Sequence, residues 1–196
     1  MTSLVTPAVP AGTMSALSQP TLGAEVGLII RPWVLSDSPD VLKAFSDPAI
    51  RQWHMLALQT ESEACDWIAV RQKSWQEEKG ANWAIGDQAT GAIIGRIGLR
   101  DVNLYVGQAE FTYWMLPHAR GQGAAARAVR AITKWCFDKI GLHRLIITHS
   151  TVNVASCKVA DKADFIYEGT MVSQLKHADG WHDMHIHGKI NRKDTR

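Results

Sequence analysis

Leu116-Pro117-His118-Ala119-Arg120-Gly121-Gln122-Gly123-Ala124-Ala125, LPHARGQGAA in the sequence, joins two segments of different periodicity. The run before it, FTYWML, is rich in β-forming residues and predicts a strand, whereas the run after it, AAARAVRAITKWCFDK, predicts a helix. In that helix the apolar residues recur at three- and four-residue spacing and predict one face packed on a sheet. They are Ala125, Ala128, Val129, Ile132, Cys136 and Ile140.

The turn has the chemistry of an anion site. The first amides of a helix lack internal partners and carry the positive end of the helix dipole. Gly121 and Gly123 let the chain turn with no side chain in the way, and Arg120 adds a full positive charge. Together these features suit a phosphate or pyrophosphate. The pattern alone is equally typical of a plain turn, but it lacks the third glycine of a dinucleotide fingerprint and the GK[ST] of a Walker loop.

Length and composition favour one ordinary globular domain. The chain has 196 residues, 46% of them hydrophobic and 20% charged. A formal net charge of +2 is too small to indicate nucleic acid or a membrane surface as partner. Three cysteines without CxxC spacing predict reduced thiols in a cytoplasmic protein. No apolar run is long enough to span a bilayer.

The chain divides into a flexible leader over 1–26, a domain over 27–191 and a frayed tail over 192–196. The leader carries no charge before Glu25, and prolines interrupt it. Within the domain the signals run strand, two helices, three strands, helix, strand, helix, two strands. Crossovers mixed with hairpins predict an α/β fold of the mixed kind, with helices on both faces of the sheet. Thr60 and Asn153 are the expected caps of two helices.

The sequence resembles the GNAT acyltransferases, most closely their RimJ/RimL branch of N-terminal acetyltransferases. RGQGA (120–124) is similar to the family's acyl-CoA pyrophosphate loop, and AEFTYWMLPHARGQG and WCFDKIGLHRLIITHSTVNVASCKVADKADFIYEG extend the match over about residues 28–190. The resemblance implies a six- or seven-stranded mixed sheet whose middle strands splay apart. One departure is Asp164, which stands where the family usually has glycine at positive φ. Aspartate tolerates that conformation, so the turn is expected to survive.

The resemblance also implies where acetyl-CoA, the expected co-substrate, would bind. The pyrophosphate is expected on the loop and the pantetheine arm beside the strand before it, with an N-x-x-S stretch near the thioester. The implied cofactor-binding residues are Trp114, Met115, Leu116, Arg120, Gly121, Gln122, Gly123, Ala124, Ala125, Asn153 and Ser156.

The chemistry sets what the catalytic residues must do. An amine attacks the thioester as the neutral base, and an α-amine with a pKa of about 8 needs less help than a lysine at about 10.4. The oxyanion needs a donor, which a strand amide near Met115 would supply, and the thiolate needs a proton. Glu110 is the predicted base and Ser156 the predicted proton donor, with Tyr167 as a rival donor. Each has an alternative reading as a strand-end carboxylate, a capping serine or a packed tyrosine.

The acceptor side is predicted from the aromatic residues. Trp53 and His54 fall where the family's helical lobe closes over the cleft, and His182 and Asp183 are expected at its mouth. The string WHDMHIH (181–187) also invites a metal interpretation. His185 and His187 share a strand face while His182 points the other way, and no cysteine or carboxylate completes a ligand set along the strand. The expectation is therefore no metal.

The sequence thus predicts an acetyl-CoA-dependent N-acetyltransferase. Its acceptor is a primary amine, either a protein or peptide N-terminus or a small molecule such as an amino acid, aminoacyl compound or antibiotic. The alternatives are a non-catalytic acyl-CoA-binding module and an enzyme using another acyl-CoA, such as succinyl-CoA. Homodimers are frequent among relatives, and nothing in the sequence shows one.

Overall fold

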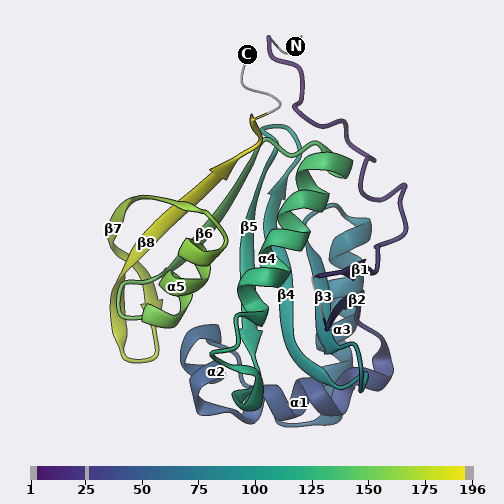
Figure 1. Ribbon diagram of the computed structural model, residues 1–196, viewed down its shortest axis with the longest axis vertical. Helices are drawn as coiled ribbons and strands as arrows, with labels where there is room; N and C mark the ends of the chain where they lie inside the picture. Colours follow the sequence, from purple (N-terminus) through teal and green to yellow (C-terminus); the bar gives the residue numbers. More distant parts are fainter. Residues whose placement is uncertain (1–3, 25–26, 193–196) are drawn as a thin grey trace.

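The computed structural model describes residues 4–24 and 27–192. Its elements alternate along the chain as the periodicities predict (Figure 1). The strands are β1 (Leu22–Gly23), β2 (Leu28–Pro32), β3 (Ala81–Asp87), β4 (Ile93–Asn103), β5 (Gln108–Met115), β6 (Arg144–Ser150), β7 (Ile166–His177) and β8 (Gly180–Ile190). The helices are η1 (Leu35–Asp37), α1 (Ser38–Ser46), α2 (Pro48–His54), α3 (Glu61–Gln76), η2 (Pro117–Ala119), α4 (Ala124–Trp135), the π-helical η3 (Cys136–Ile140) and α5 (Val154–Lys162).

The strands form one mixed sheet in the order β1-β2-β3-β4-β5-β6-β8-β7. All neighbours are antiparallel except β5 and β6, which run parallel. Six or seven strands were expected. The additional one is the two-residue β1, which pairs with β2 and comes from the segment predicted to be a leader.

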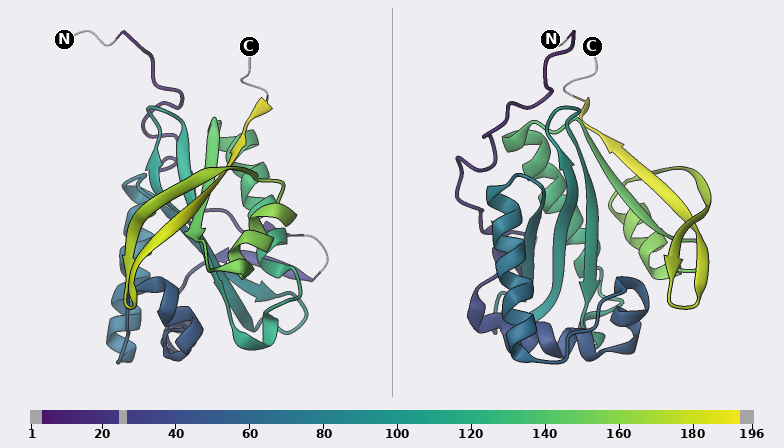
Figure 2. Two further views of the ribbon diagram at one scale, coloured as in Figure 1. Left: turned by 90° about the vertical axis from the view of Figure 1, so that its left-hand side faces the viewer. Right: turned by 180° about the vertical axis from the view of Figure 1, so that it is seen from behind.

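Helices cover both faces of the sheet, as predicted. Figure 1 shows α4 and α5 on the near face, and the reverse view in Figure 2 shows α3 on the other, with α1 and α2 across its end. The six residues of the predicted apolar stripe are all buried, from Ala125 to Ile140. A second core, including Trp33, Trp67 and Trp114, fills the opposite face. In the described ranges no helix is long and apolar enough to cross a membrane.

The capping residues predicted the starts of two helices correctly. Thr60 and Glu63 form the predicted capping box of α3, and the Asn153 side chain accepts from the Ser156 amide at the start of α5. Helix α3 ends at Gln76 rather than near Lys79. Asp164 has φ +59°, so the turn that glycine usually makes is kept by an aspartate.

The described part of the predicted leader packs on the domain. Val9 and Met14 are buried in the core beside α4. The amides of Gly12 and Met14 donate to the Glu78 carboxylate at 2.7 and 2.6 Å. Figure 1 shows this segment running along the β1–β2 side of the sheet. Burial of these apolar side chains and the hydrogen bonds to Glu78 together hold the segment on the domain. Residues 1–3, 25–26 and 193–196, which include most of the predicted tail, lie outside the described residues.

Candidate active site

Strands β5 and β6 diverge after a short contact. They pair only from Gln108 to Glu110, against Arg144 to Ile146. The Leu116 amide donates to the Ile94 carbonyl at 2.9 Å, and β4 and β5 are antiparallel. Because the hydrogen-bonding direction alternates along an antiparallel ladder, Trp114 and Leu116 bond toward β4, whereas Tyr113 and Met115 turn their backbone groups toward the gap.

The loop before α4 is an open cradle of amides. Gly121 and Gly123 have φ of +77° and +75°, and a Cβ built on either meets no atom within 4 Å. Among the described residues, none accepts a hydrogen bond from the amides of residues 121–126. Ala124 and Ala125 are buried and small, so the first turn of α4 leaves this space free. Unpaired amides at a helix N-terminus fit a pyrophosphate, so the residues present suit the CoA tail.

Arg120 does not point into this cradle. Its Nε donates to the Met115 carbonyl at 3.0 Å, and its Nη2 binds the Asp47 carboxylate at 2.7 Å. Asp47 is the N-cap of α2, where it also accepts from the Ile50 amide. Burial alone would raise the pKa of Asp47, but the bonds from Arg120 and Ile50 lower it overall. Arg120 therefore joins the glycine loop to the α2 lobe, and Asp47 partly neutralises its charge.

A cavity passes through the gap between the strands. Side chains alternate along each strand, so Glu110 and Thr148 lie on the α1–α3 face, while Tyr113 and His149 lie on the α4–α5 face. Residues from both faces line the same cavity. They are Trp53, His54, Arg100, Glu110, Phe111, Thr112, Tyr113, Thr148, His149, Ser150, Asn153, Ser156, Leu175, His177 and Met184. The gap thus connects the two faces of the sheet.

Glu110, the predicted base, lies in this cavity and is 9% exposed. Arg100 pairs with its carboxylate, and the Thr148 hydroxyl donates to the same oxygen. It is the only carboxylate among the residues that line the cavity. Both contacts are to Oε1, so the second carboxylate oxygen is left to accept a proton from a water or an amine.

Ser156, the predicted proton donor, is hydrogen-bonded to Tyr113, which no pattern in the sequence indicated as a site residue. The Tyr113 hydroxyl lies 2.7 Å from Ser156 Oγ across the gap between β5 and α5. Burial raises the pKa of Tyr113 above its ordinary value, so its phenol stays protonated. The rival, Tyr167, is half exposed on β7, where its hydroxyl contacts Thr170. It does not line the cavity.

Of the four residues predicted for the acceptor side, Trp53, His54 and His182 come together at the other end of the cavity. Trp53 from α2 packs edge-on against His182 from β8, with ring centroids 6.1 Å apart. His182 contacts the Ser150 hydroxyl at 2.7 Å. Asp183 does not face this cluster, because its carboxylate accepts from the Ser173 amide in the neighbouring strand. Burial, followed by nearby guanidinium groups, lowers the pKa of His54 to about 3, so this ring is neutral at physiological pH.

Three of the histidines form a group under α5, and one of them, His149, also lines the cavity. His149, His185, His187 and Cys157 place their ligand atoms within 4.8 Å of one another. No cysteine was expected to complete a ligand set with WHDMHIH, because Cys157 is 28 positions from His185 and on a different element. All three cysteines of the chain are unpaired thiols.

Comparisons with known proteins agree with this architecture. The family model described as an acetyltransferase (GNAT) domain matches residues 27–166. The uncharacterized N-acetyltransferase YoaA of Bacillus subtilis (strain 168) is 23% identical over 168 residues, which cover 85% of this chain and 95% of YoaA. The chain therefore belongs to the GNAT acetyltransferase family, whose members transfer acyl groups.

Solved structures from the RimJ/RimL branch share the fold. RimL, a ribosomal L7/L12 α-N-protein acetyltransferase solved with coenzyme A, superposes with a TM-score of 0.82 at 18% identity. The match covers 87% of this chain and 98% of RimL. Mycobacterium smegmatis RimJ, solved with a CoA disulfide, gives a TM-score of 0.77 at 18% identity, covering 90% and 88% of the two chains.

Proposed function

We propose that the chain is an acetyl-CoA-dependent N-acetyltransferase in which donor and acceptor meet through the gap between β5 and β6. The observation that carries this proposal is the open cradle at Gly121 and Gly123, whose amides have no partner in the described chain. The cradle follows β5, the strand on which the backbone groups of Tyr113 and Met115 face the gap. Family membership supports the reaction class.

The donor would lie on the α4–α5 face. The pyrophosphate binds the amides of Gln122 through Ala125, with Gly121 giving access, and the pantetheine arm pairs with the backbone amide of Tyr113. The Met115 carbonyl is held by Arg120, which leaves its amide for the thioester. Leu116 and Trp114 support this strand from the β4 side instead of contacting the cofactor, because their backbone groups already face β4. Arg120 acts by holding the loop to Asp47. Asn153 positions Ser156 by capping α5.

The transfer needs no covalent enzyme intermediate. The neutral amine attacks the thioester carbonyl, forming the C–N bond, while Glu110 takes the surplus proton directly or through one water. The Met115 amide stabilises the oxyanion from the strand edge. Collapse breaks the C–S bond, and the Ser156–Tyr113 pair delivers a proton to the thiolate. Tyr113 joins the proposed machinery because its hydroxyl touches Ser156.

The acceptor would enter from the α1–α2 face, past Trp53, His54 and His182, with Asp183 only supporting the β7–β8 hairpin. Three guanidinium groups, those of Arg71, Arg96 and Arg100, act on His54 at this end, and only Arg100 is paired with the cavity carboxylate, Glu110. A primary amine that also bears a carboxylate or phosphate suits this charge. Both a peptide N-terminus with acidic residues and a small amino compound meet the requirement.

An acceptor screen tests the proposal. The untagged protein is incubated with acetyl-CoA and a panel of peptides and small amines, half of them with an anionic group, and thiol release is followed. We expect turnover with at least one amine and a preference for anionic acceptors. Glu110→Gln should lower kcat about 100-fold or more while CoA affinity changes less than twofold.

Two alternatives have distinct outcomes. A non-catalytic acyl-CoA-binding module would bind CoA and turn over no amine in the panel. An enzyme for another acyl group would release thiol faster from succinyl-CoA than from acetyl-CoA. The absence of CoA binding by calorimetry would overturn the donor site itself. A cytoplasmic location and a homodimer stay predictions, from the reduced thiols and from the resemblance respectively.

A further inference from the structure

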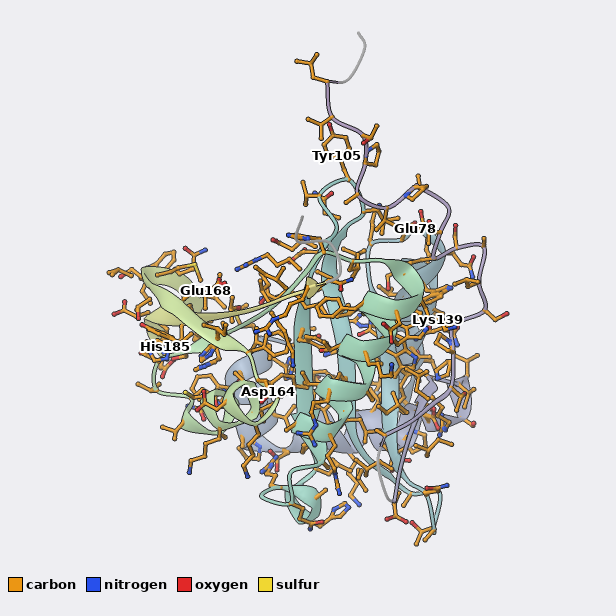
Figure 3. The ribbon with its side chains drawn as sticks, turned by 45° about the horizontal axis from the view of Figure 1, so that its top comes forward. Glu78, Tyr105, Lys139, Asp164, Glu168 and His185 are labelled. Atoms are coloured by element: carbon orange, nitrogen blue, oxygen red, sulfur yellow. The ribbon has the colours of Figure 1, made fainter. Side chains whose placement is uncertain are left out.

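A group of four metal-ligating side chains lies on the α5 face, next to the proposed chemistry, and one of them, His149, also lines the cavity. His149 stands opposite His185 in the β6–β8 ladder, and Ile147 stands opposite His187. Residues opposite or diagonal in a ladder share a face, so the three imidazoles gather above the sheet. Helix α5 supplies Cys157 from above, and all four ligand atoms lie within 4.8 Å of one another. Figure 3 shows His185 on the β7–β8 side of the molecule, the side that also carries Glu168.

The hydrogen bonds around two of these rings leave a conflict. His149 Nδ1 lies 2.9 Å from the Ser150 carbonyl, which can only accept, so this nitrogen carries the proton and Nε2 carries a lone pair. Because His187 Nε2 is turned to His149, Nδ1 is the nitrogen left for the Phe165 carbonyl that acts on this ring, and a proton there gives the same tautomer. The two Nε2 atoms then face each other at 3.2 Å, lone pair to lone pair.

Two neutral imidazoles can avoid the repulsion only by leaving another buried ring nitrogen without a hydrogen bond. If His187 moves its proton to Nε2 and donates to His149, its Nδ1 lone pair is left buried against a carbonyl. His187 is 1% exposed and His149 4% exposed, so water does not reach the unpaired atoms easily. A cation between the two Nε2 atoms removes the repulsion and lets both Nδ1 protons stay on the backbone side.

We propose that His149, His185, His187 and Cys157 bind one Zn²⁺ ion. Three imidazoles and one thiolate are a borderline-soft set that suits zinc, and zinc prefers four tetrahedral ligands of this kind. Ligand distances of about 2.0–2.3 Å put neighbouring ligand atoms roughly 3.3–3.6 Å apart. The two buried rings already meet this spacing. His185 and Cys157 are half-buried and can rotate inward to complete the site.

The site would be structural, because four protein ligands leave no open position for water or substrate. On binding, the Cys157 thiol loses its proton to solvent and the sulfur binds the metal as thiolate. Asp161 and Glu168 lie near enough to His187 to act on it electrostatically. Glu168 is paired with Arg144, so Asp161 is the negative charge that favours a bound cation. The ion would join α5 to β6 and β8. It would thereby hold Ser156, the neighbour of Cys157, against Tyr113.

The test uses the full-length, untagged protein, because a histidine tag would bind zinc itself. The protein is stripped with a chelator, titrated with Co²⁺ and then with Zn²⁺, and followed by absorbance. We expect one Co²⁺ per chain, the visible bands of a tetrahedral site and a thiolate charge-transfer band, all lost when one equivalent of Zn²⁺ is added. Zinc should also raise the midpoint of thermal unfolding.

Matched variants separate the site from adventitious binding. Cys157→Ser should abolish the charge-transfer band and weaken zinc binding on the order of 100-fold, and His185→Gln should weaken it similarly. Cys65→Ser, a half-buried cysteine on α3, should behave as wild type. Circular dichroism of each stripped variant shows whether it folds. Wild type that binds no zinc, or that binds it equally in Cys157→Ser, overturns the proposal.

Discussion

Replacing Gly123 with alanine should weaken CoA binding far more than it weakens the fold. Gly123 has φ +75°, and an added Cβ meets nothing within 4 Å. The substitution therefore costs only the left-handed backbone, about 1–2 kcal/mol. For a chain of this length that lowers the midpoint of thermal unfolding by roughly 2–8 °C. The new methyl group lies in the space proposed for the pyrophosphate.

Gly91 provides a matched control for the backbone cost. It lies in the turn between β3 and β4 with φ +72°, and its added Cβ also meets nothing within 4 Å. Gly91→Ala should therefore lose about the same stability. A hydrogen bond to a charged group contributes about 1.5–3 kcal/mol, so losing one phosphate contact at Gly123 weakens CoA binding about 10- to 150-fold.

Isothermal titration calorimetry with CoA and thermal unfolding without ligand give both quantities for both variants. The expected result is a similar loss of stability in the two proteins and a loss of CoA affinity in Gly123→Ala alone. If Gly123→Ala binds CoA within twofold of wild type, the cradle is not the diphosphate site. If Gly91→Ala loses CoA affinity equally, the effect is one of general stability.

Three further predictions concern the proton donor, a buried histidine and the N-terminal segment. Tyr113→Phe and Ser156→Ala should each lower kcat about 10- to 100-fold without changing CoA affinity, because each leaves one hydroxyl near the thiolate. His54 has a folded-state pKa of about 3 against about 6.5 when unfolded, so the unfolded chain binds the extra proton between these values and stability falls as pH drops through them. Urea unfolding from pH 7 to 4 should show a shallower loss in His54→Gln than in wild type. Met14→Ala should lower the free energy of unfolding by about 2–3 kcal/mol, because Met14 is 1% exposed in the core.

Each of these has an outcome that contradicts it. Unchanged kcat in both hydroxyl variants excludes the Tyr113–Ser156 pair as the donor. His118→Gln, at an exposed histidine, is the control for His54, and equal pH slopes in the two variants would mean that His54 is not the group that titrates. A Met14→Ala protein as stable as wild type would show that the N-terminal segment does not stabilise the domain.

Local sequence patterns were sufficient for most of the fold. The apolar period of α4, the Thr60 capping box and the Asn153 cap depend on residues a few positions apart, where backbone geometry alone decides the outcome. The same holds for Asp164, whose backbone conformation follows from its place after α5. Such signals report local structure and say little about which elements meet.

The site depends on contacts that no local pattern records. Tyr113 and Ser156 are 43 positions apart, and His149 and His187 are 38 apart. Arg120 was expected to face a phosphate, but Asp47, 73 positions away, competes for its guanidinium. The direction in which each backbone N–H and C=O of β5 points can be predicted only when the neighbouring strands, β4 and β6, are known. These facts follow from topology, which the periodicity of a single segment does not contain.

The early divergence of β5 and β6 places the open side of a strand inside an otherwise continuous sheet. Exposed strand edges tend to recruit other chains, and proteins ordinarily cap or shorten them. In this protein the pantetheine arm of CoA, which carries two amides, would take the place of a neighbouring strand along the open edge of β5. Deuterium uptake at Tyr113 and Met115 should consequently be fast in the free protein and slow once CoA is added, and self-association on storage should diminish in the same samples.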